Sequence, residues 1–186
     1  TTAGNNTAVG MNCMVTNTTG AQNTAVGAMA LDAASTADDN TAVGYQALTA
    51  NTTGTRNTSV GRSALAANLG ANDNTAVGYA AMYLNTTGAQ NTAVGKDALD
   101  ANTTVHDNTA IGVGALGVMN GGNGRNIAVG NYSGDAITTG ADNVLMGYSS
   151  AGVLTAGGSN VAVGNYALDA TTTGDLNVAV GYGALT

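Results

Sequence analysis

The chain contains no proline, phenylalanine or tryptophan, and only 8% of its 186 residues are charged. These absences exclude an ordinary globular core built on large aromatic side chains, since the apolar residues that remain are mostly alanine and valine. A single cysteine, Cys13, excludes an intrachain disulfide. No stretch reaches the roughly 18 uninterrupted apolar residues that a membrane-spanning helix needs.

Basic residues are also scarce. Four Lys and Arg residues stand against eleven acidic residues, all of them aspartate, which gives a net charge of −7. This balance argues against nucleic acid or an anionic membrane surface as a partner, and solubility is its simplest consequence. Cys13 takes a position that alanine fills in the next copies, from Ala30 to Ala98, so we expect a small buried residue rather than a nucleophile or a ligand.

What the sequence does contain is one unit repeated along its length. Asn-Thr-Ala-Val-Gly or a close relative begins eleven times, at spacings of 17 residues with one spacing of 18. Glycine interrupts every run long enough for a helix, and threonine and valine cluster where short strands would form. We therefore predict an all-β fold, a parallel β-roll or β-solenoid of eleven 17-residue repeats, as a single repeat domain over residues 1–186.

Three positions of the unit carry structural predictions. The first residue is asparagine, whose amide can donate and accept along the axis of the stack. This asparagine ladder comprises Asn6, Asn23, Asn40, Asn57, Asn74, Asn91, Asn108, Asn126, Asn143, Asn160 and Asn177. The fifth residue is always glycine, which indicates a corner with positive φ or very close backbone approach. This glycine corner comprises Gly10, Gly27, Gly44, Gly61, Gly78, Gly95, Gly112, Gly130, Gly147, Gly164 and Gly181.

The fourth residue forms an apolar ladder, which we expect to point inward or into a subunit interface. This apolar ladder comprises Val9, Val26, Val43, Val60, Val77, Val94, Ile111, Val129, Met146, Val163 and Val180. A second apolar row, mostly leucine, stands at the ninth position and carries the same expectation. Because the apolar side chains of one coil are few and small, we expect three copies to share these ladders in a homotrimer.

Two irregularities interrupt the array. Over much of the chain the units alternate in their endings, so that the true period there is 34 residues. The extra residue of the single 18-residue spacing falls in a glycine-rich stretch, and threonine at the second position gives way after it to Ile127, Val144, Val161 and Val178. We predict a sub-array over 1–118, an irregular junction with a bulge or kink over 119–125, and a more apolar sub-array over 126–186.

Few side chains offer chemistry, and we predict no catalytic residue, cofactor or metal ion. Asp39, Asp73 and Asp107 recur once per 34 residues and could hold cations, but the spacing of calcium-binding rolls is missing, which favours a turn-capping role. His106 is the only histidine, and a lone histidine in a turn is typically solvated. Active sites need unlike residues that converge, whereas this array offers the same few residues repeatedly, so we do not expect an enzyme.

The repeats Asn-Thr-Ala-Val-Gly-x-x-Ala-Leu and Asn-Thr-Thr-Gly resemble those of viral and bacterial tail-fibre proteins. They are also similar to the Asn-Ser-Val-Ala-Ile-Gly repeats of trimeric autotransporter adhesin heads. The resemblance covers residues 6–185 and implies a left-handed parallel β-roll, a homotrimer, and an extracellular location on a virion fibre or a bacterial surface. The chain differs from the adhesin heads in its longer repeat unit and in the second segment of that unit, which reads Ala-Leu-x-Ala.

These features favour a structural segment of a trimeric phage tail fibre, which spaces and presents a host-attachment tip. A cell-surface glycan or protein receptor would then bind flanking domains. One alternative is a bacterial trimeric adhesin head that touches host glycan or matrix through tyrosine and aspartate positions. A second alternative is an ice-binding β-solenoid that uses the threonine row at the second position of the unit.

Overall fold

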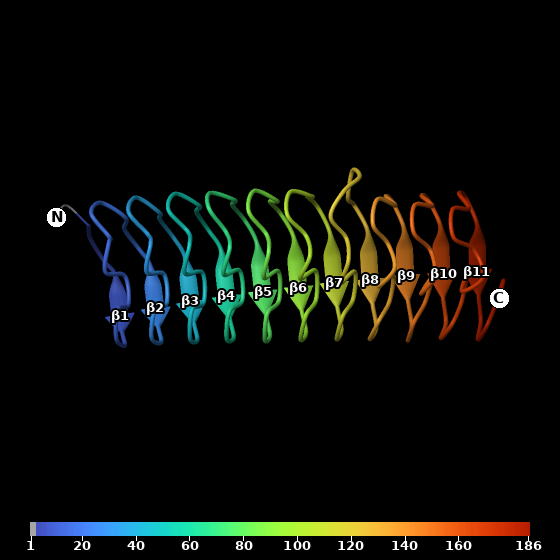
Figure 1. Ribbon diagram of the computed structural model, residues 1–186, viewed down its shortest axis with the longest axis horizontal. Coiled ribbons are helices and arrows are strands. Elements are labelled where there is room, and N and C mark those ends of the chain that lie inside the picture. The colour runs from blue at the N-terminus through green and yellow to red at the C-terminus, as the bar shows by residue number, and fades with distance from the viewer. Residues whose placement is uncertain (1–2) are drawn as a thin grey trace.

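The structure is an all-β parallel β-solenoid, as predicted. The computed structural model describes residues 3–186, so the first two residues of the domain and sub-array predictions lie outside the described residues. Eleven strands of three residues each form one parallel sheet in chain order, and no helix occurs within residues 3–186. The sheet runs along an elongated rod with the two termini at opposite ends (Figure 1). The strands are β1 (Thr7–Val9), β2 (Thr24–Val26), β3 (Thr41–Val43), β4 (Thr58–Val60), β5 (Thr75–Val77), β6 (Thr92–Val94), β7 (Thr109–Ile111), β8 (Ile127–Val129), β9 (Val144–Met146), β10 (Val161–Val163) and β11 (Val178–Val180).

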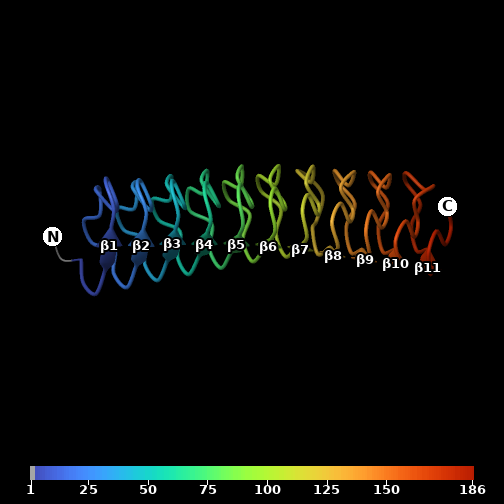
Figure 2. The same cartoon turned by 90° about the horizontal axis from the view of Figure 1, so that it is seen from below.

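Each residue of a strand pairs with the residue at the equivalent position of the next coil. Thr41 lies opposite Thr58, Val43 lies opposite Val60, and the register persists across the 18-residue spacing, where Thr109 pairs with Ile127. Neighbouring strands of a sheet lie about 4.8 Å apart, so eleven coils make a rod about 50 Å long. Identical residues therefore stack into rows that run parallel to the rod axis, as Figure 2 shows for the strands from a second side.

Backbone hydrogen bonds between coils continue well beyond the strands. The Thr41 amide donates to Asn57 O at 2.8 Å, the Leu48 amide to Ala64 O at 3.0 Å, and the Thr52 amide to Leu69 O at 2.9 Å. Other amides of the same coil donate in the opposite direction, to the preceding coil. The whole coil, rather than the three-residue strand alone, is thus held by the register with its neighbours.

The turns of each coil use left-handed backbone conformations at residues other than glycine. In one coil, Gln46, Leu48 and Arg56 have φ values of 55°, 53° and 56°, and most other coils repeat this at the seventh, ninth and seventeenth positions. A left-handed L-residue costs about 1–2 kcal/mol. At the ninth position this cost is offset because a fully buried leucine contributes about 1.5–3 kcal/mol.

The core of the roll closes within one chain. The alanines at the third and eighth positions and the leucine at the ninth are fully buried, as at Ala42, Ala47 and Leu48, all 0% exposed. The leucine row therefore points inward as predicted, but it fills the interior of a single roll, and the expectation that three copies share it is wrong.

The apolar ladder at the fourth position lies on the outside of the roll. Val43, Ile111 and Met146 are 36%, 40% and 44% exposed. Successive side chains of a strand point to opposite faces, so an inward alanine leaves the residues on both sides of it facing outward. Of the two predicted placements for this ladder, the inward one is wrong and the subunit-interface placement stays a prediction.

The glycine corner has the geometry that its sequence predicts. Its φ values lie between 124° and 141°, a region that L side chains rarely adopt. In each coil but the last, a Cβ atom at the corner would also collide with the carbonyl group of the next corner, as Gly78 would with Gly95. Both reasons for glycine, positive φ and close backbone approach, therefore apply.

The irregular junction is a loop that protrudes between β7 and β8 (Figure 1). Gly122 and Gly124 take φ values of 80° and 72° there, which lets the 18-residue coil accommodate its extra residue outside the stack. The irregularity predicted for residues 119–125 thus takes the form of a loop, and the register of the sheet passes it unchanged.

Gly78→Ala should lower the melting temperature sharply, by the equivalent of more than about 3 kcal/mol, because it adds a backbone collision to the strain of the corner. Gly181→Ala is the matched control: its φ is 124°, yet nothing lies within 4 Å of the added Cβ. Thermal unfolding followed by circular dichroism should show a much smaller effect for the control. Equal shifts would contradict the role assigned to coil-to-coil contact.

Candidate functional site

The asparagine ladder is a buried structural element. The backbone N–H of Asn57 donates to Asn40 Oδ1 at 2.9 Å, and the side-chain Nδ2 of Asn57 donates to the same oxygen at 3.1 Å. Asn40 Nδ2 in turn donates to Gly54 O at 2.8 Å. From Asn23 to Asn160 the ladder residues are at most 1% exposed, so these amides satisfy backbone groups at a buried corner. They have no access to a substrate.

A second asparagine ladder lies at the twelfth position and was not predicted. Asn51, Asn68, Asn85 and Asn102 are each 0% exposed, and each Nδ2 donates to the carbonyl three residues later. Consecutive members also bond to one another, as Asn68 Nδ2 does to Asn51 Oδ1 at 2.9 Å. After this ladder ends, Met119, Ile137 and Leu154 occupy the same position and are also buried. The C-terminal sub-array is therefore more apolar inside as well as outside.

We use the term sheet face for the outward side chains of the strands, at the second and fourth positions of the unit. Along β1–β7 it presents a threonine row beside the apolar ladder, and along β8–β11 both rows are apolar. Turn threonines such as Thr52 donate their hydroxyl to a backbone carbonyl, here Leu69 O at 3.0 Å. By contrast, within residues 3–186 no strand threonine hydroxyl has a protein partner. The threonine row comprises Thr7, Thr24, Thr41, Thr58, Thr75, Thr92 and Thr109.

Asp39, Asp73 and Asp107 do not cap the turns as predicted, and the residue before each of them does so instead. Asp38, Asn72 and His106 are the residues that cap, since they accept the amides of Ala21, Thr55 and Ala89 at 2.7, 2.7 and 2.9 Å. His106 accepts through Nδ1, so this lone histidine fills the same structural role as the other two.

Asp73 instead pairs with a cation from the chain itself. Arg56 Nε and Nη2 donate to its carboxylate at 2.6 and 2.9 Å, and Arg125 binds Asp142 in the same way. The arginine holds the pKa of each partner carboxyl below its usual range. Asp39 and Asp107 lie on the other side of Arg56 and Arg125 along the axis and add a weaker attraction. Within residues 3–186 no group of three His, Cys or Asp side chains could hold a metal ion.

Tyrosines form two clusters just beyond the glycine corner, one or two residues after it in the chain. Tyr132, Tyr148, Tyr166 and Tyr182 lie on consecutive coils with edge-to-face rings whose centroids are 6.0, 5.5 and 5.8 Å apart. Toward the N-terminus the Arg62 guanidinium lies between the rings of Tyr45 and Tyr79, 5.6 and 5.8 Å from their centroids. The rings pack on one another and on arginine, while about 40% of most of these side chains remains exposed.

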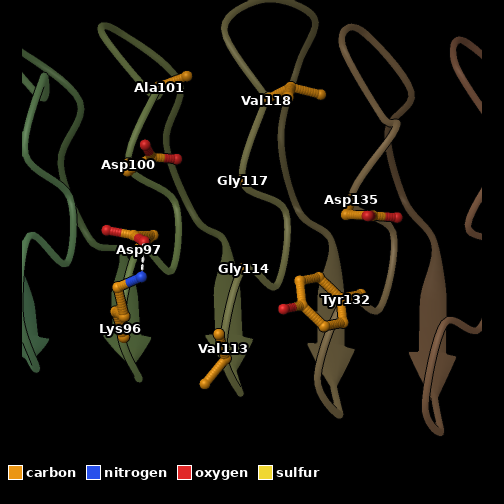
Figure 3. Close-up of a pocket in the computed structure, with 10 residues that line it drawn as sticks. All are labelled: Lys96, Asp97, Asp100, Ala101, Val113, Gly114, Gly117, Val118, Tyr132 and Asp135. Atoms are coloured by element: carbon orange, nitrogen blue, oxygen red, sulfur yellow. Dashed lines mark ion pairs between the residues drawn. The ribbon is translucent and has the colours of Figure 1, made fainter.

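An open groove of about 350 Å³ crosses the coils that contain β6, β7 and β8. Its floor is formed where Gly114 and Gly117 carry no side chain (Figure 3). Asp97 and Asp100 project on one side of these glycines, Tyr132 and Asp135 lie on the other, and Lys96 binds Asp97 at 3.1 Å. These are the tyrosine and aspartate positions that the adhesin hypothesis invokes, and glycan binding there stays a prediction.

Two carboxyl groups of the groove titrate above their usual range. Burial raises the pKa of Asp100, with a further contribution from the charge of Asp97. Burial likewise raises the pKa of Asp135, with a smaller contribution from Asp169.

Cys13 matches its predicted role in part. It packs against the core and donates Sγ–H to Ala25 O at 3.2 Å, but it is only half-buried because it lies in the first coil. Burial raises the pKa of its thiol, which is opposite to what a reactive cysteine needs.

Comparison with models of known protein families, with curated proteins and with solved structures gives no match to this chain. Within the described part of the chain, no helix is long and apolar enough to cross a membrane.

The two asparagine ladders should differ in what they contribute to stability. Asn91→Leu leaves the buried Asn108 amide without its acceptor, Asn91 Oδ1, and should cost about 3 kcal/mol. Asn68→Leu should cost about 1 kcal/mol, because every group that bonds to Asn68 keeps another partner. Ala71 O keeps Asn57 Nδ2, Asn51 Oδ1 keeps the Gly54 amide, and Asn85 Nδ2 keeps Gly88 O. Later coils also carry Ile137 or Leu154 at this position. Chemical denaturation of both variants would test this, and an equal cost would contradict it.

The groove and ion-pair carboxylates should respond oppositely to pH. The folded-state pKa of Asp100 is raised, so its contribution to stability is present at low pH and lost as the pH rises through that pKa. Asp100→Asn should therefore raise the melting temperature at pH 7, with a gain that disappears below the ordinary carboxyl pKa. Asp142 has a lowered pKa, so Asp142→Asn should lower the melting temperature at pH 7 and have no effect in acid. Melting curves of both variants and the parent chain from pH 2 to 8 test this. Differences in melting temperature that do not change with pH would contradict it.

Proposed function

We propose that this chain is a non-enzymatic structural segment of an extracellular fibre, most simply a homotrimeric, left-handed phage tail-fibre rod that spaces a host-attachment tip. The observation that carries the proposal is the unbroken register of eleven coils, which gives a long, uniform body from short repeats. A solenoid of this kind extends by stacking, and each added coil lengthens it by about 4.8 Å without changing its width.

The distribution of side chains supports a mechanical role. The asparagine ladder, the glycine corner and the inward leucines all serve coil-to-coil stacking. The groove is open, and so are the other hollows of about 350–400 Å³ along the rod, so none of them encloses a ligand as an active-site pocket would. Outside the core, the sheet face leaves an uncharged, partly apolar strip along the full length of the rod, which supports association between copies.

Light scattering on a size-exclusion column tests the proposal directly. The expected molar mass is three times 18.0 kDa, and negative-stain images should show rods about 50 Å long with blunt ends. A chain that stays folded and monomeric at every concentration would overturn the fibre proposal.

The threonine row favours a second candidate, ice binding. Its hydroxyls have no protein partner within residues 3–186, and they recur at the spacing of the coils beside the apolar side chains of the fourth position. Such a surface can hold water at fixed positions. A folded monomer with thermal hysteresis, abolished by Thr75→Lys and retained by the turn variant Thr87→Lys, would select this candidate over the fibre.

A further inference from the structure

The sheet face presents apolar side chains from β1 to β11, and it changes character at the junction. Through β7 its second-position row is threonine, and from β8 onward that row is Ile127, Val144, Val161 and Val178. The exposed fraction of Ile127 is 43% and that of Met146 in the fourth-position row is 44%. We call the N-terminal part of the face, β1–β7, the wet part because one of its two rows carries hydroxyl groups. We call the C-terminal part, β8–β11, the dry part because both of its rows are apolar.

We infer that other copies of this chain cover the sheet face, packed parallel and in register, with the dry part contributing most of the affinity. This inference rests on the proposed fibre, and it deepens that proposal by naming the surface, the polarity and the register of the assembly.

The size of the face is the first argument for a second copy. It is about 50 Å long and about 10 Å wide, so two copies would contribute about 1,000 Å² of footprint, the lower limit for a specific interface. The four dry strands alone would contribute less than half of that. Contact must therefore extend into the threonine part.

Charge and periodicity are the second argument. The chain has a net charge of −7, yet no charged residue stands at the second or fourth position of any of the eleven units. Two copies can thus meet here without placing like charges opposite each other. The rows also repeat at every coil, and another rod with the same repeat can match them along the whole length.

The change at the junction sets polarity and register. In a parallel, in-register assembly, apolar strands meet apolar strands, while threonines meet threonines and can bond to each other or through water. An antiparallel arrangement would place β8–β11 against β1–β4 and cover unpartnered hydroxyls with isoleucine and valine, which costs free energy. A shift by one or more coils would create the same mismatch at the junction.

Lysine substitutions test which surface is covered. Light scattering over a concentration series should show that Met146→Lys, in the dry part, raises the midpoint of assembly at least tenfold. Val43→Lys, in the wet part, should raise it less, and Thr87→Lys, on an exposed turn, should leave it unchanged. Circular dichroism of each variant at low concentration verifies that the single rolls remain folded.

If the parent chain assembles but Met146→Lys does not weaken it, or weakens it no more than Thr87→Lys does, the sheet face is not the contact and the fibre proposal still stands. If the parent chain is monomeric throughout, both fail.

Disulfide trapping tests polarity in the same assembly. In a Cys13→Ala background, a tagged Val43→Cys chain is mixed with an untagged Met146→Cys chain and oxidised. The parallel register should give only like pairs, Val43→Cys with itself and Met146→Cys with itself. Antiparallel packing brings β3 opposite β9, so predominantly mixed pairs would overturn the inferred polarity.

Discussion

In-register stacking of one coil on the next is the interaction on which the rest of this structure depends. The strands, the turn amides and both asparagine ladders all form hydrogen bonds along the rod axis, and these bonds join residues about one repeat apart in the chain. Any residue that disturbs the register would break several of these bonds at once, because the coil has few contacts of other kinds. The narrow interior follows from this: a short coil encloses mostly alanine, asparagine and one or two larger apolar side chains, and the tyrosines lie outside.

The periodicity of the sequence was enough to predict the strands, the asparagine ladder and the glycine corner. Each of them depends on a residue type with a special backbone or hydrogen-bonding property. The left-handed leucines escaped prediction because leucine is not a turn residue, and only its burial keeps it in that conformation. Asn51 and its equivalents escaped for the opposite reason, since Asn-Thr-Thr-Gly is typical of an exposed turn.

The direction of the valines shows a different limit of sequence reasoning. In Thr-Ala-Val the larger apolar side chain would ordinarily be assigned to the core, and three residues are too few to reveal an alternating pattern. The middle residue of the strand points inward, so the apolar ladder shares the outer surface with the threonine row. Self-association and ice binding would both need this surface, and a rod that buries it between copies has none left for ice.

The alternation of caps and charges along the turns has a consequence for how such a rod can change length. Asp38, Asn72 and His106 cap every second coil. At the seventeenth position aspartate recurs with the same double period, and Arg56, Gln90 or Arg125 separates each aspartate from the next. Loss or gain of a single coil there would bring two caps together, or Asp39 beside Asp73 without Arg56 between them. Duplication or deletion of coils in pairs preserves both patterns. In this part of the chain the natural unit of growth is therefore two coils, although one coil is the repeat of the backbone.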